Sequence, residues 1–308
     1  MTAPSYVVIE RFTHVTPFGI GLWDAVTGAL VSEGLSVRVR ALAGTEVAST
    51  TMATATRSGL FAAHGLQRLR AFESGSDGLE SWAIASPPRP HLVDVRDDTG
   101  RFLPFALHVL LPARGRALPP CVDALWPIEL PSPLASSPAS ATVPSYVPLF
   151  STPARTTPAG RATVRARILT DRASGAPAAW AVLELRRAGQ LLARGIANTR
   201  GEVVAMFAYP EPPDPPPTSP GGGAGAPTVP LAEQSWPIEI TVRHRADMPT
   251  YPVGTRDAVP DLCELLQQPS TAVFTSSPLA PLTEATLRYG EELVLGAPSG
   301  AELFISPA

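Results

Sequence analysis

The sequence lacks lysine, has only two cysteines and contains no long apolar run. All 24 basic residues are arginine, which we attribute to a compositional bias of the source genome rather than to selection for bidentate contacts. No stretch approaches the roughly 20 apolar residues that span a bilayer, so membrane insertion is not expected. The first 12 residues contain Glu10 and Arg11 and no signal-peptide pattern. They predict a soluble, cytoplasmic chain.

The two cysteines, Cys121 and Cys263, are too few for a disulfide framework and too isolated for a structural zinc site. A lone cysteine is usually a small buried hydrophobe, and a nucleophilic thiolate requires a base or a cation nearby. We therefore expect two buried thiols without a catalytic role. A reducing compartment during synthesis fits this expectation.

Charge is balanced along the chain, with 24 basic and 27 acidic residues and a formal net charge of −3. A nucleic-acid footprint or a membrane-surface patch requires clustered basic residues. Nucleic acid is therefore not an expected partner.

Proline is abundant, with 36 of 308 residues. Because proline fixes φ and removes a backbone donor, it divides a chain into short segments that suit strands and loops better than helices. The hydrophobic fraction of 44% is sufficient for a packed core. The predicted fold class is mainly β, and the chain length indicates about two domains.

The predicted organisation is two tandem β-sandwich domains of one kind, residues 1–115 and 159–308. A Pro- and Ser-rich connector, residues 116–158, joins them. The second domain contains a Pro/Gly-rich loop at residues 210–230, which is expected to be exposed and either extended or flexible.

Alternating apolar residues predict the strands. Val37 and Val39, for example, alternate with Arg38 and Arg40. The predicted strands are 6–12, 35–42, 60–63, 92–96 and 102–111 in the first domain, and 162–169, 179–186, 191–197, 203–208 and 238–243 in the second. The turn sequence 96–101 predicts a β-hairpin. Near the C-terminus we expect a short helix after Pro260 and a last hairpin from residues 285–289 and 293–295.

The two halves repeat an order of features. Asp24-Ala-Val-Thr27-Gly28 matches Asp171-Arg-Ala-Ser174-Gly175, and each motif is followed by a strand. A second turn then follows, Thr56-Arg-Ser-Gly59 or Asn198-Thr-Arg-Gly201, and leads into another apolar strand. Asp and Asn bond to their own backbone at turns, and Gly supplies positive φ, so these motifs predict turns rather than catalysis.

This order of motifs resembles the carboxypeptidase regulatory-like domain, a transthyretin-like, Ig-like β-sandwich. The resemblance covers about half of each repeat and implies a fold rather than an activity.

A second resemblance is to proteins encoded beside phage-tail-like contractile injection systems. It rests on Gly100-Arg-Phe-Leu-Pro-Phe, Pro148-Leu-Phe-Ser-Thr-Pro, Pro177-Ala-Ala-Trp-Ala-Val-Leu-Glu, Tyr209-Pro-Glu-Pro and Leu287-Arg-Tyr-Gly-Glu-Glu-Leu-Val-Leu. It implies a non-enzymatic structural component of the particle, at the baseplate or at a tube or sheath end. The implied partners are other particle subunits, which the chain would contact through sheet edges and extended loops. The assembled particle would be released or docked on a membrane.

No catalytic, cofactor or metal site is predicted. The five histidines have no metal-ligand spacing, and common hydrolase, nucleotide and dinucleotide motifs are missing. The run of Asp94, Asp97 and Asp98 is more typical of a hairpin turn than of a calcium loop. The histidines are His14, His64, His91, His108 and His244.

The alternative function is a carbohydrate- or surface-binding module of a fibre or an adhesin, which requires exposed aromatic residues. Trp82, Trp180 and Trp236 lie in or beside predicted strands and are expected in the core, whereas Trp126 lies in the connector. An enzyme is a third hypothesis, and it requires titratable groups that converge in a pocket.

Overall fold

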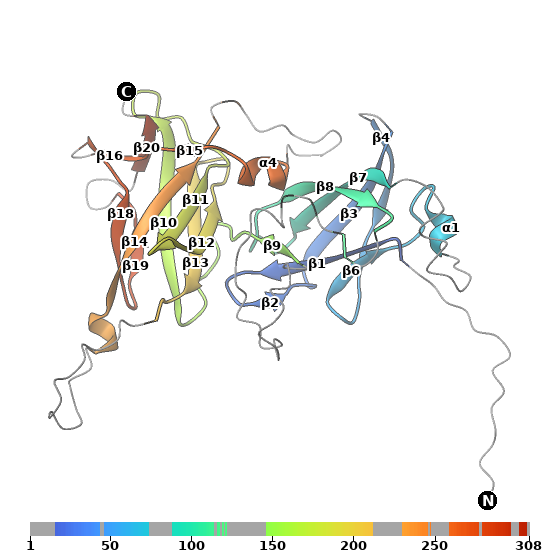
Figure 1. Cartoon of the computed structure of the whole chain (residues 1–308), viewed down its shortest axis with the longest axis horizontal. Coiled ribbons are helices and arrows are strands. Elements are labelled where there is room, and N and C mark those ends of the chain that lie inside the picture. Colours follow the sequence, from blue (N-terminus) through green and yellow to red (C-terminus); the bar gives the residue numbers. More distant parts are fainter. Residues whose placement is uncertain are drawn as a thin grey trace, which may run out of the picture.

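The chain forms antiparallel β-sheets with little helix (Figure 1). The computed structural model describes residues 16–43, 46–73, 88–113, 116–117, 119, 121, 146–211, 230–245, 247, 259–276, 279–296 and 302–306. The mainly β fold class is confirmed. The predicted strand at residues 6–12 and most of the 210–230 loop lie outside the described residues.

The first half, residues 16–149, contains two sheets. One has the order β2-β1-β6-β5, with β9 parallel to β1. The other has the order β4-β3-β7-β8. The elements are β1 (Phe18–Asp24), β2 (Ala29–Leu30), β3 (Leu35–Ala43), β4 (Glu46–Met52), β5 (Thr54–Ala55), β6 (Leu60–Ala63), α1 (Arg70–Glu73), β7 (Arg89–Asp97), β8 (Phe105–Leu111) and β9 (Val147–Leu149).

The second half, residues 161–306, repeats this plan. One sheet has the order β13-β10-β20-β16-β17, with β19 beside β10, and the other has the order β12-β11-β14-β15, with β18 beside β14. The elements are β10 (Arg161–Asp171), β11 (Val182–Arg187), β12 (Gln190–Ile196), β13 (Glu202–Ala208), a 3-10 turn (Leu231–Glu233), β14 (Ser235–Arg243), α4 (Leu262–Leu266), β15 (Ser270–Thr271), β16 (Phe274–Ser276), β17 (Leu279–Pro281), β18 (Glu284–Arg288), β19 (Glu292–Val294) and β20 (Glu302–Ser306).

The internal repeat is present in the sheets. The order β4-β3-β7-β8 corresponds to β12-β11-β14-β18, and the antiparallel pair β1–β6 corresponds to β10–β13. In each half, the inward faces of the two sheets pack against each other through alternating apolar residues, as in Val37 and Val39 of β3 and Leu183 and Leu185 of β11. Each half is therefore a two-layered β-structure.

The repeated turns have similar hydrogen bonds, because each aspartate accepts from the hydroxyl three residues on and from a backbone N–H of the turn. Asp24 accepts from Val26 N at 3.0 Å and from Thr27 Oγ1 at 2.7 Å. Asp171 accepts from Ser174 N and from Ser174 Oγ, both at 2.6 Å. The following glycines, Gly28 and Gly175, have φ of 74° and 60°. Turn chemistry is therefore confirmed at both aspartates.

The β7–β8 hairpin and the helix after Pro260 are confirmed, but the predicted last hairpin is wrong. β18 pairs with β14 in one sheet, whereas the next strand, β19, runs parallel to β10 in the other. The turn at residues 289–291 therefore carries the chain from one layer of the sandwich to the other. Alternation predicts strands but does not say which strand each one joins.

Part of the predicted connector contributes to the first half. β9 pairs with β1, and the segment behind it bonds to the β7–β8 loop through Leu103 N to Phe150 O and Thr152 N to Arg101 O, both at 2.8 Å. The ring of Tyr146 packs closely on β1 at Gly21. A Cβ added to Gly21 would lie 2.3 Å from Tyr146 Cδ1, so a larger residue does not fit there. The proline at position 148 is tolerated because β9 is a short edge strand.

Gly201 is required by a close backbone approach. Its φ is 76°, and an added Cβ would lie 2.2 Å from the carbonyl oxygen of Ile168. Gly189 also has positive φ, 78°, but an added Cβ would meet nothing within 4 Å. A side chain at Gly189 would be disfavoured only by the positive φ, whereas a side chain at Gly201 would also collide with the backbone.

We expect Gly201→Ala to lower the free energy of unfolding much more than Gly189→Ala. The Gly189 variant incurs only the left-handed backbone penalty, about 1–2 kcal/mol. The Gly201 variant must also displace the strand carrying Ile168, with a total loss on the order of 3 kcal/mol or more. Urea unfolding of both variants measures the difference, and equal losses would contradict the close approach.

Candidate functional site

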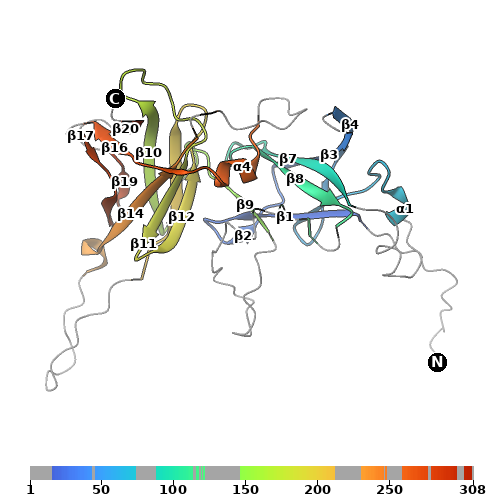
Figure 2. The ribbon, with the colours of Figure 1, turned by 45° about the horizontal axis from the view of Figure 1, so that its top comes forward.

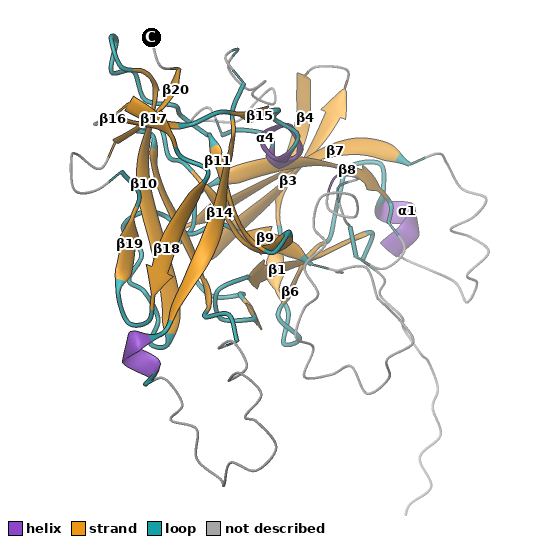
Figure 3. Ribbon diagram, turned by 60° about the vertical axis from the view of Figure 1, so that its left-hand side comes forward, coloured by secondary structure: helices purple, strands orange, loops and turns teal. Residues whose placement is uncertain are grey.

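The most distinctive feature is a segment of the second half that crosses onto the first half. The chain leaves β14 at Arg243 and returns to it at Ser270, which pairs with Arg243. Between them, residues 259–269, here called the crossing segment, contact the first half (Figures 1 and 2). Figure 3 shows α4 of this segment beside β7 and β8.

The crossing segment begins by covering the edge of β8. Val259 packs on Leu92 and Ala106 in a small apolar cluster. Ala106 N donates to Pro260 O at 2.9 Å, and Ala106 forms a parallel bridge with Asp261. An edge that would otherwise present unpaired backbone groups is thus occupied by the same chain.

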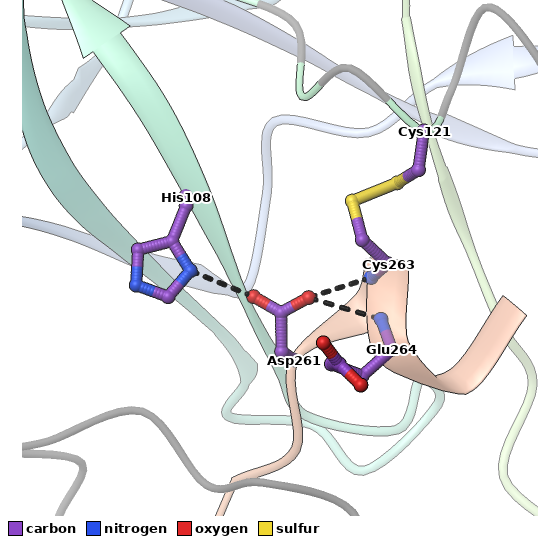
Figure 4. The surroundings of a disulfide bond; sticks show 5 residues. All are labelled: His108, Cys121, Asp261, Cys263 and Glu264. Atoms are coloured by element: carbon purple, nitrogen blue, oxygen red, sulfur yellow. Dashed lines mark hydrogen bonds and ion pairs between the residues drawn. A yellow bond between two sulfur atoms is a disulfide. The ribbon is translucent and has the colours of Figure 1, made fainter. Parts of the chain in front are cut away.

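Helix α4 follows and enters the core of the first half. Asp261 is its N-cap, accepting from Cys263 N at 2.8 Å and from Glu264 N at 3.1 Å through Oδ1. The other oxygen, Oδ2, lies 3.1 Å from His108 Nδ1 on β8 (Figure 4). The buried leucines of α4 belong to the same apolar cluster as the first-half sheets, and they are Leu262, Leu265 and Leu266.

A disulfide closes this contact. Cys121 and Cys263 are bonded, with Cα atoms 5.4 Å apart and a sequence separation of 142 (Figure 4). The prediction of two separate thiols is therefore wrong. Their number alone could not reveal the pairing, because the crossing segment that brings Cys263 to Cys121 is a long-range feature of the fold. The only available signal was that the chain has two cysteines and no others.

An ion pair anchors the link between the halves to the end of β1. Arg155, just before β10, donates from Nη1 and Nη2 to the two oxygens of Asp24 at 3.0 and 2.6 Å. The guanidinium also bonds to Ser151 Oγ and lies 4.8 Å from the centre of the Phe102 ring. Burial raises the pKa of Asp24, but hydrogen bonds from Arg155 and Thr27 outweigh it, so this pKa lies below its ordinary value.

A third contact is apolar. Val26, in the turn after β1, packs on Val204 and Met206 of β13. The first core also includes residues at the near side of the second half, namely Trp180, Val182 and Ile196. The halves are therefore joined by apolar packing, by the backbone bond from Ala106 to Pro260 and by the disulfide.

Other buried charges are paired within their own sheets. Asp94, fully buried on β7, accepts from Arg40 at 2.9 Å and from Arg96 at 3.4 Å. Arg40 lies on β3, whereas Asp94 and Arg96 lie on β7. The ion pair between Arg40 and Asp94 therefore joins the two strands. These contacts account for a carboxylate that the sequence left open as a calcium ligand.

Glu184 on β11 has a similar environment. It is buried and lies 2.8 Å from Arg194, 3.1 Å from Arg243 and 3.3 Å from Arg186. Burial raises the pKa of Glu184, but the charges of Arg194 and Arg243 outweigh burial and lower it. Because Glu184 is directly opposite Arg194, the pair also fixes the register of β11 and β12.

The remaining aspartates of the suspected calcium run form a hairpin turn. Asp97 accepts from Thr99 N, Arg101 N and Phe102 N at 3.2, 2.5 and 3.1 Å, and Asp98 is exposed. In the part of the chain that the structure describes, no group of three or more metal-ligating side chains converges. The hairpin interpretation of this run is confirmed.

The histidines are dispersed. His108 contacts Asp261, His64 is exposed, and His14 lies outside the described residues. His91 is buried, and burial lowers its pKa, as it also does for His244.

All three tryptophans among the described residues are buried. The exposed fractions of Trp23, Trp180 and Trp236 are 8%, 6% and 1%. Trp180 and Trp236 are core residues as predicted, while Trp82 and Trp126 lie outside the described residues. The three described tryptophan rings therefore cannot form a surface on which sugars stack.

Comparison of the chain with protein-family models, with curated proteins and with solved structures finds no match. Among the described residues, no helix has the length and apolar character needed to cross a membrane.

We expect Cys263→Ser to lower the free energy of unfolding by about 2–5 kcal/mol in non-reducing buffer, because the disulfide closes a long loop. Urea unfolding with and without a thiol reductant measures the effect. Reduced wild type should match the variant, and Cys121→Ser should match Cys263→Ser, since both remove one bond. A variant that stays less stable than reduced wild type would assign the loss to the serine itself.

We expect Asp24→Asn to lower the free energy of unfolding at pH 7 by on the order of 3–5 kcal/mol, because Arg155 is left buried without its carboxylate. The lowered pKa of Asp24 means that its contribution is present above its ordinary pKa and is lost as the pH falls through the folded-state value. The difference from wild type should therefore shrink below about pH 4.

Urea unfolding across pH 2–7 tests this expectation, with Asp98→Asn as the control. Asp98 is exposed at the hairpin turn, so its variant should stay within about 0.5 kcal/mol of wild type. A difference for Asp24→Asn that does not change with pH would contradict the ionic origin of the contact.

Proposed function

We propose that the chain is a non-enzymatic structural component of a phage-tail-like contractile injection particle, placed at the baseplate or at a tube or sheath end. It joins neighbouring particle subunits through the edges of its sheets and through extended loops. It is made in the cytoplasm and enters a particle that is then released or docked on a membrane. The suggestion of this particle comes from the sequence stretches at residues 100–105, 148–153, 177–184, 209–212 and 287–295.

The observation that carries the structural role is the fixed contact between the halves. The crossing segment and the Val26 contact join the two β-structures at separate points, and the Arg155–Asp24 ion pair anchors the link between them to β1. A subunit that bridges neighbours in a large assembly must hold its docking surfaces at a constant separation and angle. Two units joined only by a flexible linker would not.

The use of the polar residues also supports this role. Asp24, Asp94 and Glu184 are buried and paired with arginine, and Asp97 and Asp171 bond to turn backbones. Asp261 caps α4. A catalytic carboxylate must instead reach a substrate, so these six residues serve the stability of the fold.

The disulfide is compatible with a particle that leaves the cytoplasm. Disulfides persist in oxidising surroundings and are rare in reducing ones. We propose that Cys121 and Cys263 bond after the chain meets an oxidising environment, which locks a contact already formed by apolar packing.

The alternative is a carbohydrate- or surface-binding module. Burial of three tryptophans disfavours it, but Tyr209 and Tyr289, which are half-buried with ring centres 4.7 Å apart, offer a small aromatic pair. A glycan-array screen of the purified chain addresses this function directly.

The proposal is tested by affinity purification of the tagged chain from its native host, followed by mass spectrometry. We expect sheath, tube or baseplate subunits to be recovered. As a matched control, Leu265→Asp places a charge at a buried position of α4 and should release the contact between the halves, reducing that recovery. Recovery of no particle subunit, with the chain monomeric and positive on glycans, would replace the proposal with the alternative.

A further inference from the structure

Trp180, two residues before β11, has an unusual backbone conformation. Its φ is 65°, in the left-handed region where a bulky residue is an outlier. Ala181 N donates to Ala178 O at 3.2 Å, which closes a turn over residues 178–181 with Trp180 as its third residue. Positive φ at the third residue is the mark of a type II turn, which normally has Gly or Asn there. A tryptophan at this position is therefore strained.

The first half uses glycine where the second half uses Trp180. The chain enters β3 through Gly34, whose φ is 73°. Glycine adopts this conformation without strain because it has no Cβ. The second half has a far larger residue at the entry into β11, the strand that corresponds to β3. Such strain persists only where the surrounding structure offsets it.

The side chain of Trp180 supplies the offsetting interaction. Its exposed fraction is 6%, and it belongs to the apolar cluster that the first-half sheets form with α4. Trp236, by contrast, lies in the core of the second half. Buried tryptophans are among the side chains that contribute most to packed contacts. Trp180 is thus a residue of the second half that stabilises the contact between the halves.

The crossing segment also holds the backbone of this turn. Gln268 is buried, and its Nε2 donates to Trp180 O at 2.9 Å and to Leu265 O at 3.1 Å. Its Oε1 accepts from Arg245 N at 2.9 Å. One buried amide therefore links the turn to α4 and to the chain that leaves β14. Displacement of α4 would remove the apolar surroundings of the Trp180 ring and disturb this link.

The turn has a second conformation with the same ends. Rotation of the peptide group between Ala179 and Trp180 converts a type II turn into a type I turn, in which the third residue has φ of about −90°. The ends can stay in place because the second half holds both of them. Ala178 N donates to Ile168 O at 2.9 Å, and Ala181 O accepts from Ala197 N at 2.8 Å. The type I form has no left-handed residue and no such strain.

We propose that the turn at residues 178–181 is a strained latch between the halves. While α4 is in place, burial of the Trp180 ring offsets the strain of the left-handed backbone. When α4 leaves the first half, the peptide group rotates, φ of Trp180 becomes negative and the strain is released. The strain therefore favours opening of the contact, which the disulfide opposes. This inference goes beyond the proposed function, because the latch lies within one chain and requires no particle subunit.

The test measures opening through the reactivity of Cys121 in the full-length Cys263→Ser chain, where Cys121 is the one remaining thiol. Cys121 is 4% exposed, so iodoacetamide should alkylate it only in molecules that have opened. Trp180→Ala removes the ring and keeps the strain of the closed form, whereas Trp180→Gly removes both. Both variants should react faster than the parent, and Trp180→Ala should react about 5- to 30-fold faster than Trp180→Gly.

Ala179→Gly is the matched control. Ala179 belongs to the same turn but does not have positive φ, so this variant should react within about threefold of the parent. Circular dichroism checks that each variant is folded before its reactivity is compared.

A fluorine measurement tests the tryptophan itself and does not depend on the folding of the Trp180 variants. The chain is labelled with fluorotryptophan, and Leu265→Asp displaces α4 by placing a charge at a buried position. The fluorine signal of Trp180 should move to the position of an exposed tryptophan. The signal of Trp236, in the core of the second half, should stay where it is.

Three results would overturn the inference. Equal reactivity of Trp180→Ala and Trp180→Gly would show that opening releases no strain. Reactivity of Trp180→Ala equal to that of the parent would show that the ring does not hold the contact closed. A joint shift of the Trp180 and Trp236 signals would show that the turn is released only when the second half unfolds. Recovery of particle subunits bears only on the proposed function.

Discussion

The contact of residues 259–269 with the first half is the constraint on which the rest of the structure depends. The segment leaves β14 and returns to it, so β15 can pair with β14 only if the excursion has somewhere to pack. Burial of the apolar α4 leucines favours the packing of the segment on the first half. The hydrogen bond from Ala106 N to Pro260 O fixes its position along β8. The disulfide then makes the arrangement covalent. The two similar β-structures are thereby held together by packing and by a covalent bond, and not by the linking chain alone.

Buried ion pairs fix the register of neighbouring strands. Removing one member of such a pair is costly because the other charge remains buried, even where the intact pair contributes little net stability. Glu184 is opposite Arg194 across β11 and β12, and Asp94 joins β3 and β7 through Arg40. A slip of one residue would send these charges to the apolar face of the sheet. The polar groups therefore select one strand pairing among several that apolar packing alone would permit.

The sequence revealed the local features and missed the long-range ones. Turn chemistry at Asp24 and Asp171, alternation in β3 and the helix after Pro260 are set by neighbouring residues, and all are present. Strand β1 was not predicted because Gly19 and Gly21 weaken its strand pattern. In the structure, the absence of a side chain at Gly21 leaves room for the ring of Tyr146. The last two predicted strands exist but enter different sheets. The disulfide and the Arg155–Asp24 pair join residues more than 100 positions apart, which no local pattern encodes.

The bond between Cys121 and Cys263 also changes the connectivity of the molecule. The chain from one cysteine to the other, together with the disulfide, forms a closed covalent ring that contains β9 to β14 and the Pro/Gly-rich loop. A single cut by a protease anywhere in that ring opens it without separating any part of the molecule. A cut in the loop would therefore leave both halves covalently attached, and reduction of the disulfide would then remove the covalent bond between the two fragments.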